Sequence, residues 1–222
     1  MALTATATSG TRKKIIESLE MIDCKVILHT PNNVNIYYAV QPMPSSGPMQ
    51  VLSPLIRELC TDGIKSKRTI VFCQTYDHLL QLFQMTALEL GRHGKFSIEG
   101  TDPSDSFLCD KFDACTSLAR RENIIQSFTK PDGTLRLVFA TVAFSMGLDS
   151  PNVRRIVHWS PPNDLDMYVQ ETGRAGRDGE DAIAVLYYSD KGKRLSEEMK
   201  SYSHNTVTCR VVLCQHLGFQ VK

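Results

Sequence analysis

The sequence lacks the features that would assign it directly to a nucleic-acid-binding, membrane or secreted class. Lys and Arg number 25 against 24 Asp and Glu, so no bulk positive charge indicates a nucleic-acid partner, and any such contact must be local. No apolar run approaches the roughly 18 residues of a membrane span, so no membrane partner is expected. Residues 1–14 lack the order of a secretory signal, in which charge precedes an apolar core.

The cysteines show no disulfide framework. There are seven, an odd number at irregular spacing, in a chain without a secretory signal. This pattern indicates reduced thiols, as in the cytosol or nucleus. Cys73 ends an apolar strand, and we expect it to be a small core residue.

A phosphate-binding loop is also absent from the sequence. The pattern Gly-x-x-x-x-Gly-Lys-Ser/Thr does not occur, because the Gly-Lys pairs at 94–95 and 192–193 lack the other glycine and the hydroxyl. No acidic magnesium-binding box follows an apolar strand. The 222 residues nevertheless suffice for one good-sized core, with or without a small appendage.

Strand and helix patterns alternate from Val51 to Tyr188. This alternation predicts an α/β three-layer sandwich with a mainly parallel sheet. Residues 91–116 give no clear pattern, and we expect a surface loop at 101–106. The strands are expected at 26–28, 34–40, 69–73, 135–140, 153–159 and 182–188, and the helices at 9–21, 51–60, 77–90, 117–128, 165–172, 190–202 and 206–217.

The most informative stretch is residues 136–179. A buried strand leads into Thr141 and a turn-prone segment, and a second strand follows. A short helix comes next; Asn163 or Asp164 can cap its start, and Gly173 ends it. Ligands of open parallel sheets bind outside the carboxyl ends of the strands, so we expect a polyanion site at that edge.

Two arginines follow this helix. The guanidinium group is always charged and matches phosphate oxygens in pairs, and Gly173 and Gly176 allow the backbone to approach a ligand closely. Alternatively, Arg174 and Arg177 complement the helix dipole. That alternative does not account for the Gly-Arg-Ala-Gly-Arg spacing or for Gln170 one turn upstream.

Four segments resemble the motifs of superfamily-two helicases, in the right order along nearly the whole chain. Residues 140–149 (ATVAFSMGLD) resemble motif V, and residues 170–177 (QETGRAGR) resemble motif VI. Residues 2–7 (ALTATA) resemble motif III, and residues 70–75 (IVFCQT) resemble motif IV. The form Gln-Glu-x-Gly-Arg-Ala-Gly-Arg-Asp-Gly is similar to the RecQ family in particular.

The resemblance implies the second RecA-like lobe, of the P-loop NTPase type, of an ATP-dependent 3′-to-5′ DNA helicase. Arg177 would be the arginine finger on the γ-phosphate, supported by Arg174 and Gln170. Gly147 and Asp149 would lie at the nucleotide, with Asp149 near the ribose. ATP and Mg²⁺ would be held mainly by a first lobe that this sequence does not include.

The resemblance also implies a DNA partner, as a single strand or a duplex junction, and a nuclear protein of DNA repair and recombination, with the cytoplasm as the alternative location. Thr75, Thr141, Ala143 and Ser145 would face the DNA. The family usually has Gly at the position of Ser145. At residues 111–116 the chain has KFDACT where the family has Tyr-His-Ala-Gly-Leu, which leaves no DNA contact to assign there.

Domain boundaries follow from the same resemblance. Residues 1–40 would be the end of the first lobe and the inter-lobe connection, 41–190 the second lobe, and 191–222 the start of a RecQ-type helical and zinc-binding appendage. Cys209 resembles the first zinc ligand of that appendage, but no Cys-x-x-Cys follows Cys209 and Cys214. We therefore expect no complete zinc site and no other metal site.

Three alternatives remain open. An RNA helicase of the DEAD-box type would share the lobe, although it would normally have His where this chain has Gly173. An ATP-inactive module could keep the nucleic-acid surface or bind a partner. The third alternative is that Met1 is an internal methionine of a truncated gene model, and we favour it as the explanation of the length.

Overall fold

The computed structural model describes residues 2, 7–27, 33–92, 107–145, 150, 152–189, 195–204 and 209–219. Their centre is a six-stranded sheet in the order β1-β6-β5-β2-β4-β3, in which all neighbouring strands pair in parallel. The strands are β1 (Ile36–Pro42), β2 (Arg68–Phe72), β3 (Cys109–Phe112), β4 (Leu137–Ala140), β5 (Val153–His158) and β6 (Ala182–Tyr188).

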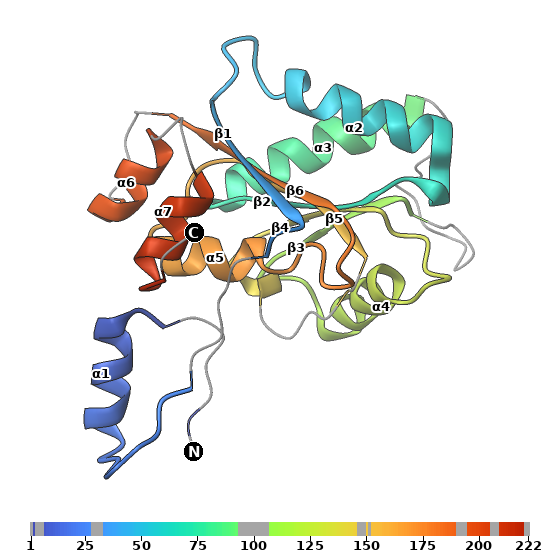
Figure 1. The fold of residues 1–222 in the computed structure, drawn as a ribbon. Helices are drawn as coiled ribbons and strands as arrows, with labels where there is room; N and C mark the ends of the chain where they lie inside the picture. The colour runs from blue at the N-terminus through green and yellow to red at the C-terminus, as the bar shows by residue number, and fades with distance from the viewer. Residues whose placement is uncertain are drawn as a thin grey trace.

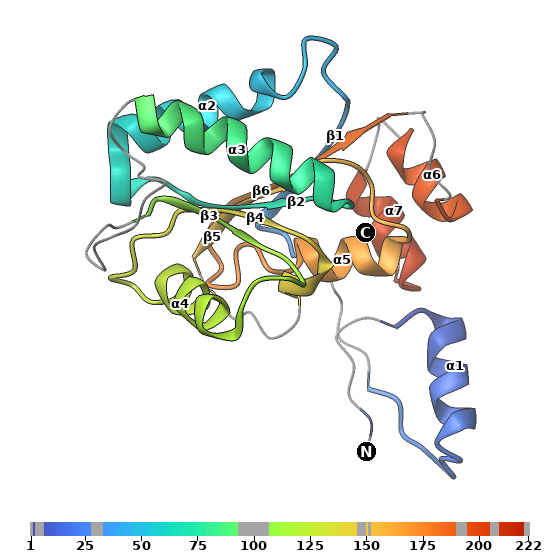
Figure 2. The same cartoon turned by 180° about the vertical axis from the view of Figure 1, so that it is seen from behind.

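Helices cover both faces of the sheet, which confirms the predicted three-layer sandwich (Figure 1). One face carries α2 (Met49–Asp62) and α3 (Tyr76–Arg92), and the other carries α4 (Leu118–Thr129) and α5 (Leu165–Thr172), as Figure 2 also shows. The short helices η1 (Gly63–Lys65) and η2 (Val142–Ser145) lie in connections. The remaining helices are α1 (Ser9–Ser18), α6 (Glu197–Ser203) and α7 (Cys209–His216).

Each face of the sheet carries an apolar layer of the core. Side chains alternate along β2, so Ile70 and Phe72 pack towards α4 while Val71 and Cys73 pack towards α2 and α3. All five residues of β2 are buried, as expected for a central strand of a parallel sheet. Cys73 is the core residue that the sequence predicted.

The last two helices pack on the lobe beside α5. Tyr202 of α6 lies against Tyr168 of α5, with ring centroids 5.0 Å apart. Arg210 of α7 donates hydrogen bonds to the carbonyl oxygens of Asn33 (2.7 Å) and Ile36 (2.6 Å), and its guanidinium lies 5.7 Å from the ring centroid of Tyr38. One arginine therefore joins α7 to the start of β1.

Several local expectations were wrong. Val26 and Ile27 do not form a strand. Thr8 caps α1 by accepting a hydrogen bond from the Thr11 amide (3.1 Å). β3 was not predicted. β1 pairs with β6 along its whole length and includes residues 40 and 41; the domain boundary expected between them stays a prediction. Most of residues 2–7, the expected motif III, lie outside the described residues.

The Arg210 contacts predict a measurable loss of stability on truncation. Arg210→Ala should lower the free energy of unfolding by about 1–3 kcal/mol, because hydrogen bonds to charged groups have that strength. Urea denaturation followed by circular dichroism measures the loss. Arg92→Ala, which removes a mostly exposed arginine, is the control and should change stability by less than about 0.5 kcal/mol. An equal effect of the two changes would contradict a joining role for Arg210.

Candidate functional site

Three polar loops meet at the carboxyl edge of the sheet. They follow β2, β4 and β3, which are neighbours in the sheet order. The Cys73 amide donates to the Ala140 carbonyl (2.8 Å), and the Thr141 amide donates to the Phe112 carbonyl (3.1 Å), so the strand ends are held side by side. Segments distant in the sequence therefore share one edge.

The predicted DNA-facing residues lie at this edge. Thr75 is exposed, and its Oγ1 accepts a hydrogen bond from the His78 amide (3.2 Å) at the start of α3. Thr141 is half-buried, and its carbonyl accepts from the Phe144 amide (3.0 Å) to begin η2. Ala143 and Ser145 belong to η2, and only their backbone is described.

The loop after β3, where the chain departs from the RecQ pattern, is held by its own charges. Asp113 pairs with Lys111 (2.7 Å) and accepts a hydrogen bond from the Cys115 amide (2.7 Å). Burial raises the pKa of Asp113, but these partners outweigh it and leave the pKa below its ordinary value. Arg121 donates to the carbonyls of Thr116 (2.8 Å) and Ala114 (2.6 Å). Asp113 and Arg121 were not among the predicted site residues.

The arginine loop, defined here as residues 173–180, lies at the opposite, amino edge of the sheet. The Gly176 amide donates to the carbonyl of Val153, the first residue of β5 (3.0 Å). Asn35, directly before β1, donates from Nδ2 to the carbonyls of Gly176 (2.7 Å) and Glu180 (2.8 Å). The expectation that the arginines lie at the carboxyl edge was therefore wrong, because α5 carries the chain back along the sheet.

Only glycine fits at position 176 of this loop. Its φ of +59° lies in the left-handed region, and a Cβ there would come within 2.4 Å of Asn35 Nδ2 and 2.8 Å of the Glu180 carbonyl oxygen. The predicted close approach at Gly176 is real, although the partner seen here is the protein's own Asn35. Gly173 instead ends α5 with an ordinary helical φ of −64°.

The two arginines have different environments. Arg174 is buried, and burial together with the charge of Arg177 lowers its pKa, while Glu171 acts in the opposite direction. Arg177 is exposed, and its Nε lies 3.4 Å from the Gly173 carbonyl oxygen. Gln170 is exposed on α5. The loop thus presents one mostly buried and one accessible guanidinium.

A bidentate ion pair anchors the far side of the loop. Arg154 of β5 donates to both carboxylate oxygens of Asp178, at 2.9 and 2.6 Å. This contact raises the pKa of Arg154 and lowers that of Asp178. Arg154 and Asn35 were not predicted as site residues, and nothing in their local sequence marks them.

The residues directly before β5 also lie at the amino edge. Asn152, directly before β5, accepts a hydrogen bond from Arg68, the first residue of β2. Buried Ser150 donates from Oγ to the Phe128 carbonyl (3.3 Å). Gly147 and Asp149 lie outside the described residues.

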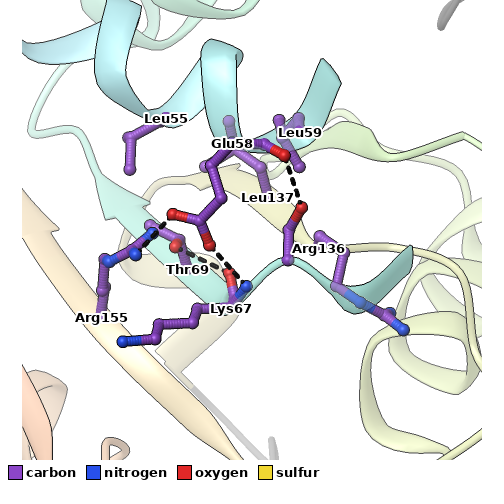
Figure 3. Close-up of a pocket in the computed structure, with 9 residues that line it drawn as sticks. Leu55, Glu58, Leu59, Lys67, Thr69, Arg136, Leu137 and Arg155 are labelled. Atoms are coloured by element: carbon purple, nitrogen blue, oxygen red, sulfur yellow. Dashed lines mark hydrogen bonds and ion pairs between the residues drawn. The ribbon is translucent and has the colours of Figure 1, made fainter. Parts of the chain in front are cut away.

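A small pocket at the amino edge lies on the α2 face of the sheet (Figure 3). Glu58 accepts hydrogen bonds there from Arg155 (2.5 Å) and from the Lys67 amide (2.8 Å). Burial raises the pKa of Glu58, but these partners bring it below the ordinary value. Since Arg154 and Arg155 are consecutive in a strand, they point to opposite faces, and this pocket is separate from the arginine loop. Its charges join α2 to the sheet.

A fully buried acid–base pair links the end of β5 to the last turn of α5. His158, the last residue of β5, lies with Nε2 2.8 Å from Oε2 of Glu171 in the last turn of α5. The ring of Phe72 stacks on His158 at 5.3 Å, and the ring of Tyr168 lies 4.8 Å away. Sequence reasoning missed this pair, although a glutamate on the apolar side of a short helix was a signal.

Within the described part of the chain, no three His, Cys, Asp or Glu side chains gather as a metal site, and no helix is long and apolar enough to cross a membrane. Cys209 begins α7 and packs, with buried Cys214 nearby in the same helix, against the lobe. Burial raises the pKa of Cys214. The expected lack of a complete zinc site stays a prediction.

The buried pair predicts a specific pattern of stability in variants. His158→Phe should lower the free energy of unfolding by about 3–5 kcal/mol, because it leaves the Glu171 carboxylate buried without its partner. The double variant His158→Phe/Glu171→Leu should recover much of that loss, since both polar groups are then gone. Urea denaturation measures both, with Glu197→Gln, from an exposed pair, as the control. If the double variant were as unstable as the single one, the loss in His158→Phe would not come from leaving Glu171 without its partner.

Comparisons with known proteins identify the family of the chain. The model of the helicase conserved C-terminal domain matches residues 50–179. ATP-dependent DNA helicase Q1 of Mus musculus is 30% identical over 231 residues, which cover 97% of this chain and 33% of the relative. ATP-dependent DNA helicase RecQ of Pasteurella multocida is 30% identical over 188 residues, or 85% of this chain and 26% of that protein. The chain thus spans about a third or less of these relatives.

Solved structures show the same fold. Saccharomyces cerevisiae Dbp5 bound to RNA and ADP BeF3 superposes with a TM-score of 0.62 at 17% identity, over 98% of this chain and 50% of that one. Domain 2 of the DEAD-box helicase Mss116p bound to an RNA duplex superposes with a TM-score of 0.53 at 18% identity. The superposition covers 75% of this chain and 67% of that one. The chain therefore belongs to the helicase conserved C-terminal domain family, in the form found in RecQ-like DNA helicases.

Proposed function

We propose that this chain is the second motor lobe of an ATP-dependent 3′-to-5′ DNA helicase. In this proposal the arginine loop serves the nucleotide, and the carboxyl edge forms part of the DNA track. The observation that carries it is the placement of these two polar regions at opposite edges of one sheet, which lets one lobe contact two ligands at once. The 3′-to-5′ direction, the first-lobe partner and nuclear work in DNA repair and recombination are proposed from the resemblance to the RecQ family.

The arginine loop suits a nucleotide phosphate. Arg177 is accessible, so its guanidinium could contact a γ-phosphate held by the first lobe and stabilise the charge of the transferring group. Arg174, buried under the loop, and Gln170 would hold that arrangement, with Gly147 and Asp149 on the ribose side. ATP supplies the phosphoanhydride bond that is hydrolysed. Mg²⁺ would be held by the first lobe, since the described residues offer no carboxylate cluster.

The carboxyl edge suits a DNA backbone. Thr75 and Thr141 provide hydroxyl donors, and the backbone of η2 at Ala143 and Ser145 adds amides. The amino ends of α3 and α4 also lie at this edge, because each helix follows a strand of a parallel sheet, and helix amino ends favour phosphate.

An ATP-inactive nucleic-acid-binding or partner-binding module is the second candidate. The observation that favours it is the lack of a Gly-x-x-x-x-Gly-Lys-Ser/Thr loop in the 222 residues. Both candidates use the carboxyl edge, but only the motor uses the arginine loop for catalysis.

Selective loss of function separates the two candidates. The chain alone should not turn over ATP, because an arginine finger acts only on a phosphate that another group holds. After fusion to a related first lobe, Arg177→Ala should lower ATP turnover by roughly 10³- to 10⁵-fold and change DNA affinity little. Thr141→Ala should weaken DNA binding and abolish stimulation of the ATPase by DNA. Steady-state ATPase and fluorescence anisotropy measure these effects.

Two outcomes would overturn the assignment. ATPase of the pure chain that Arg177→Ala abolishes would contradict the need for a first lobe. Equal losses of melting temperature in both variants, without a selective loss of function, would make Arg177 a structural residue at the end of a helix.

DNA binding by the chain alone should be weak and strongly dependent on salt. The net charge of +1 leaves only local phosphate contacts, and each neutralised phosphate of a single strand changes log K by about −0.7 per decade of salt. Titration of a labelled oligonucleotide at 50 and 200 mM salt measures the slope. Tight binding that salt does not change would indicate a different kind of partner surface.

A further inference from the structure

Tyr76 lies at the carboxyl edge of the sheet. It is the first residue of α3 and follows Thr75 directly. The Thr75 carbonyl accepts a hydrogen bond from the Leu79 amide (3.1 Å), and its side chain accepts one from the His78 amide (3.2 Å). The backbone of Tyr76 is therefore held rigidly, while the residue keeps 47% of its surface exposed.

The ammonium group of Lys111 lies over one face of the Tyr76 ring. Lys111 Nζ, on β3, lies 5.6 Å from the ring centroid. The same Nζ is paired with the buried carboxylate of Asp113 at 2.7 Å, which limits the freedom of the lysine. The tyrosine is thus supported from one side, and its exposed surface is available to another flat group.

Other apolar side chains are exposed at the same edge. Val142, after β4, is 47% exposed, and Leu118, at the start of α4, is 77% exposed. Single exposed apolar residues are ordinary on protein surfaces. Here each apolar residue directly follows a hydroxyl residue in the sequence: Tyr76 follows Thr75, Leu118 follows Ser117 and Val142 follows Thr141. Apolar side chains next to phosphate-binding groups suit a single strand, which offers both bases and phosphates.

We propose that Tyr76 is a stacking residue for a base of single-stranded DNA. The inference rests on the proposed function of the carboxyl edge and adds a specific contact to it. A base would stack on the ring face opposite Lys111, while the neighbouring phosphate meets Thr75 and the first turn of α3. Such stacking is tolerant of sequence, because every base has a π-face.

The test is the affinity of the full 222-residue chain for a fluorescein-labelled oligothymidylate, measured by anisotropy at low salt. Tyr76→Ala should weaken binding on the order of 5- to 100-fold, as expected for loss of one stacked base. Tyr76→Phe keeps the ring and should bind like the parent. Tyr37→Ala is the matched control, because Tyr37 is 67% exposed and is the second residue of β1, near the amino edge. Thermal melting checks that all three variants are folded.

A second probe separates stacking from charge. An abasic oligonucleotide of the same length keeps the phosphates, so Tyr76→Ala and the parent should bind it equally. If Tyr76→Ala binds oligothymidylate as the parent does, stacking is refuted while the DNA track stands. If Tyr76→Ala loses equal affinity for both probes, the tyrosine acts on the backbone and the proposal is also wrong. If the parent binds neither probe, the DNA function of this edge fails, and the inference fails with it.

Discussion

The parallel direction of all six strands is the constraint on which the rest of this structure depends. Each strand must be followed by a connection that returns the chain to the amino edge. Between β5 and β6 that connection is α5, which starts at the carboxyl edge and delivers the arginine loop to the amino edge, where Gly176 binds the Val153 carbonyl. The proposed DNA-facing groups, such as Thr141, and the arginine loop are therefore separated by the length of the strands.

Contacts around α5 and the arginine loop determine where the arginines lie. The buried pair of His158 and Glu171 joins β5 to α5, and Asn35 and Arg154 hold the loop that follows. The loop is thus held by residues outside the two arginines, which would not themselves touch a ligand. In the proposed motor, this division leaves Arg177 accessible for a phosphate.

The sequence predicted the parts of the fold that depend on local pattern. The strands at 69–73, 153–159 and 182–188 were each placed within a residue, because short apolar runs with β-branched residues are recognisable. β3 was missed because its four residues, Cys109–Phe112, include Asp110 and Lys111, as an edge strand permits. Gly176 was identified from spacing, and its positive φ agrees. The Asn35 contact joins residues 141 positions apart, and no local pattern shows it. The edge at which the arginines lie depends on the direction in which α5 runs. The general rule that ligands bind at the carboxyl ends of parallel strands does not give that direction.

The central claim is that nucleic acid contacts the carboxyl edge and leaves the arginine loop free. Nuclear magnetic resonance of the ¹⁵N-labelled chain, titrated with a short unlabelled oligothymidylate, tests it most directly. The account predicts backbone amide shifts in residues 73–76, 113–118 and 141–145, with Gly176, Arg177 and Asp178 unchanged. Shifts concentrated in residues 173–180 would contradict it, because the two edges would then not serve different ligands.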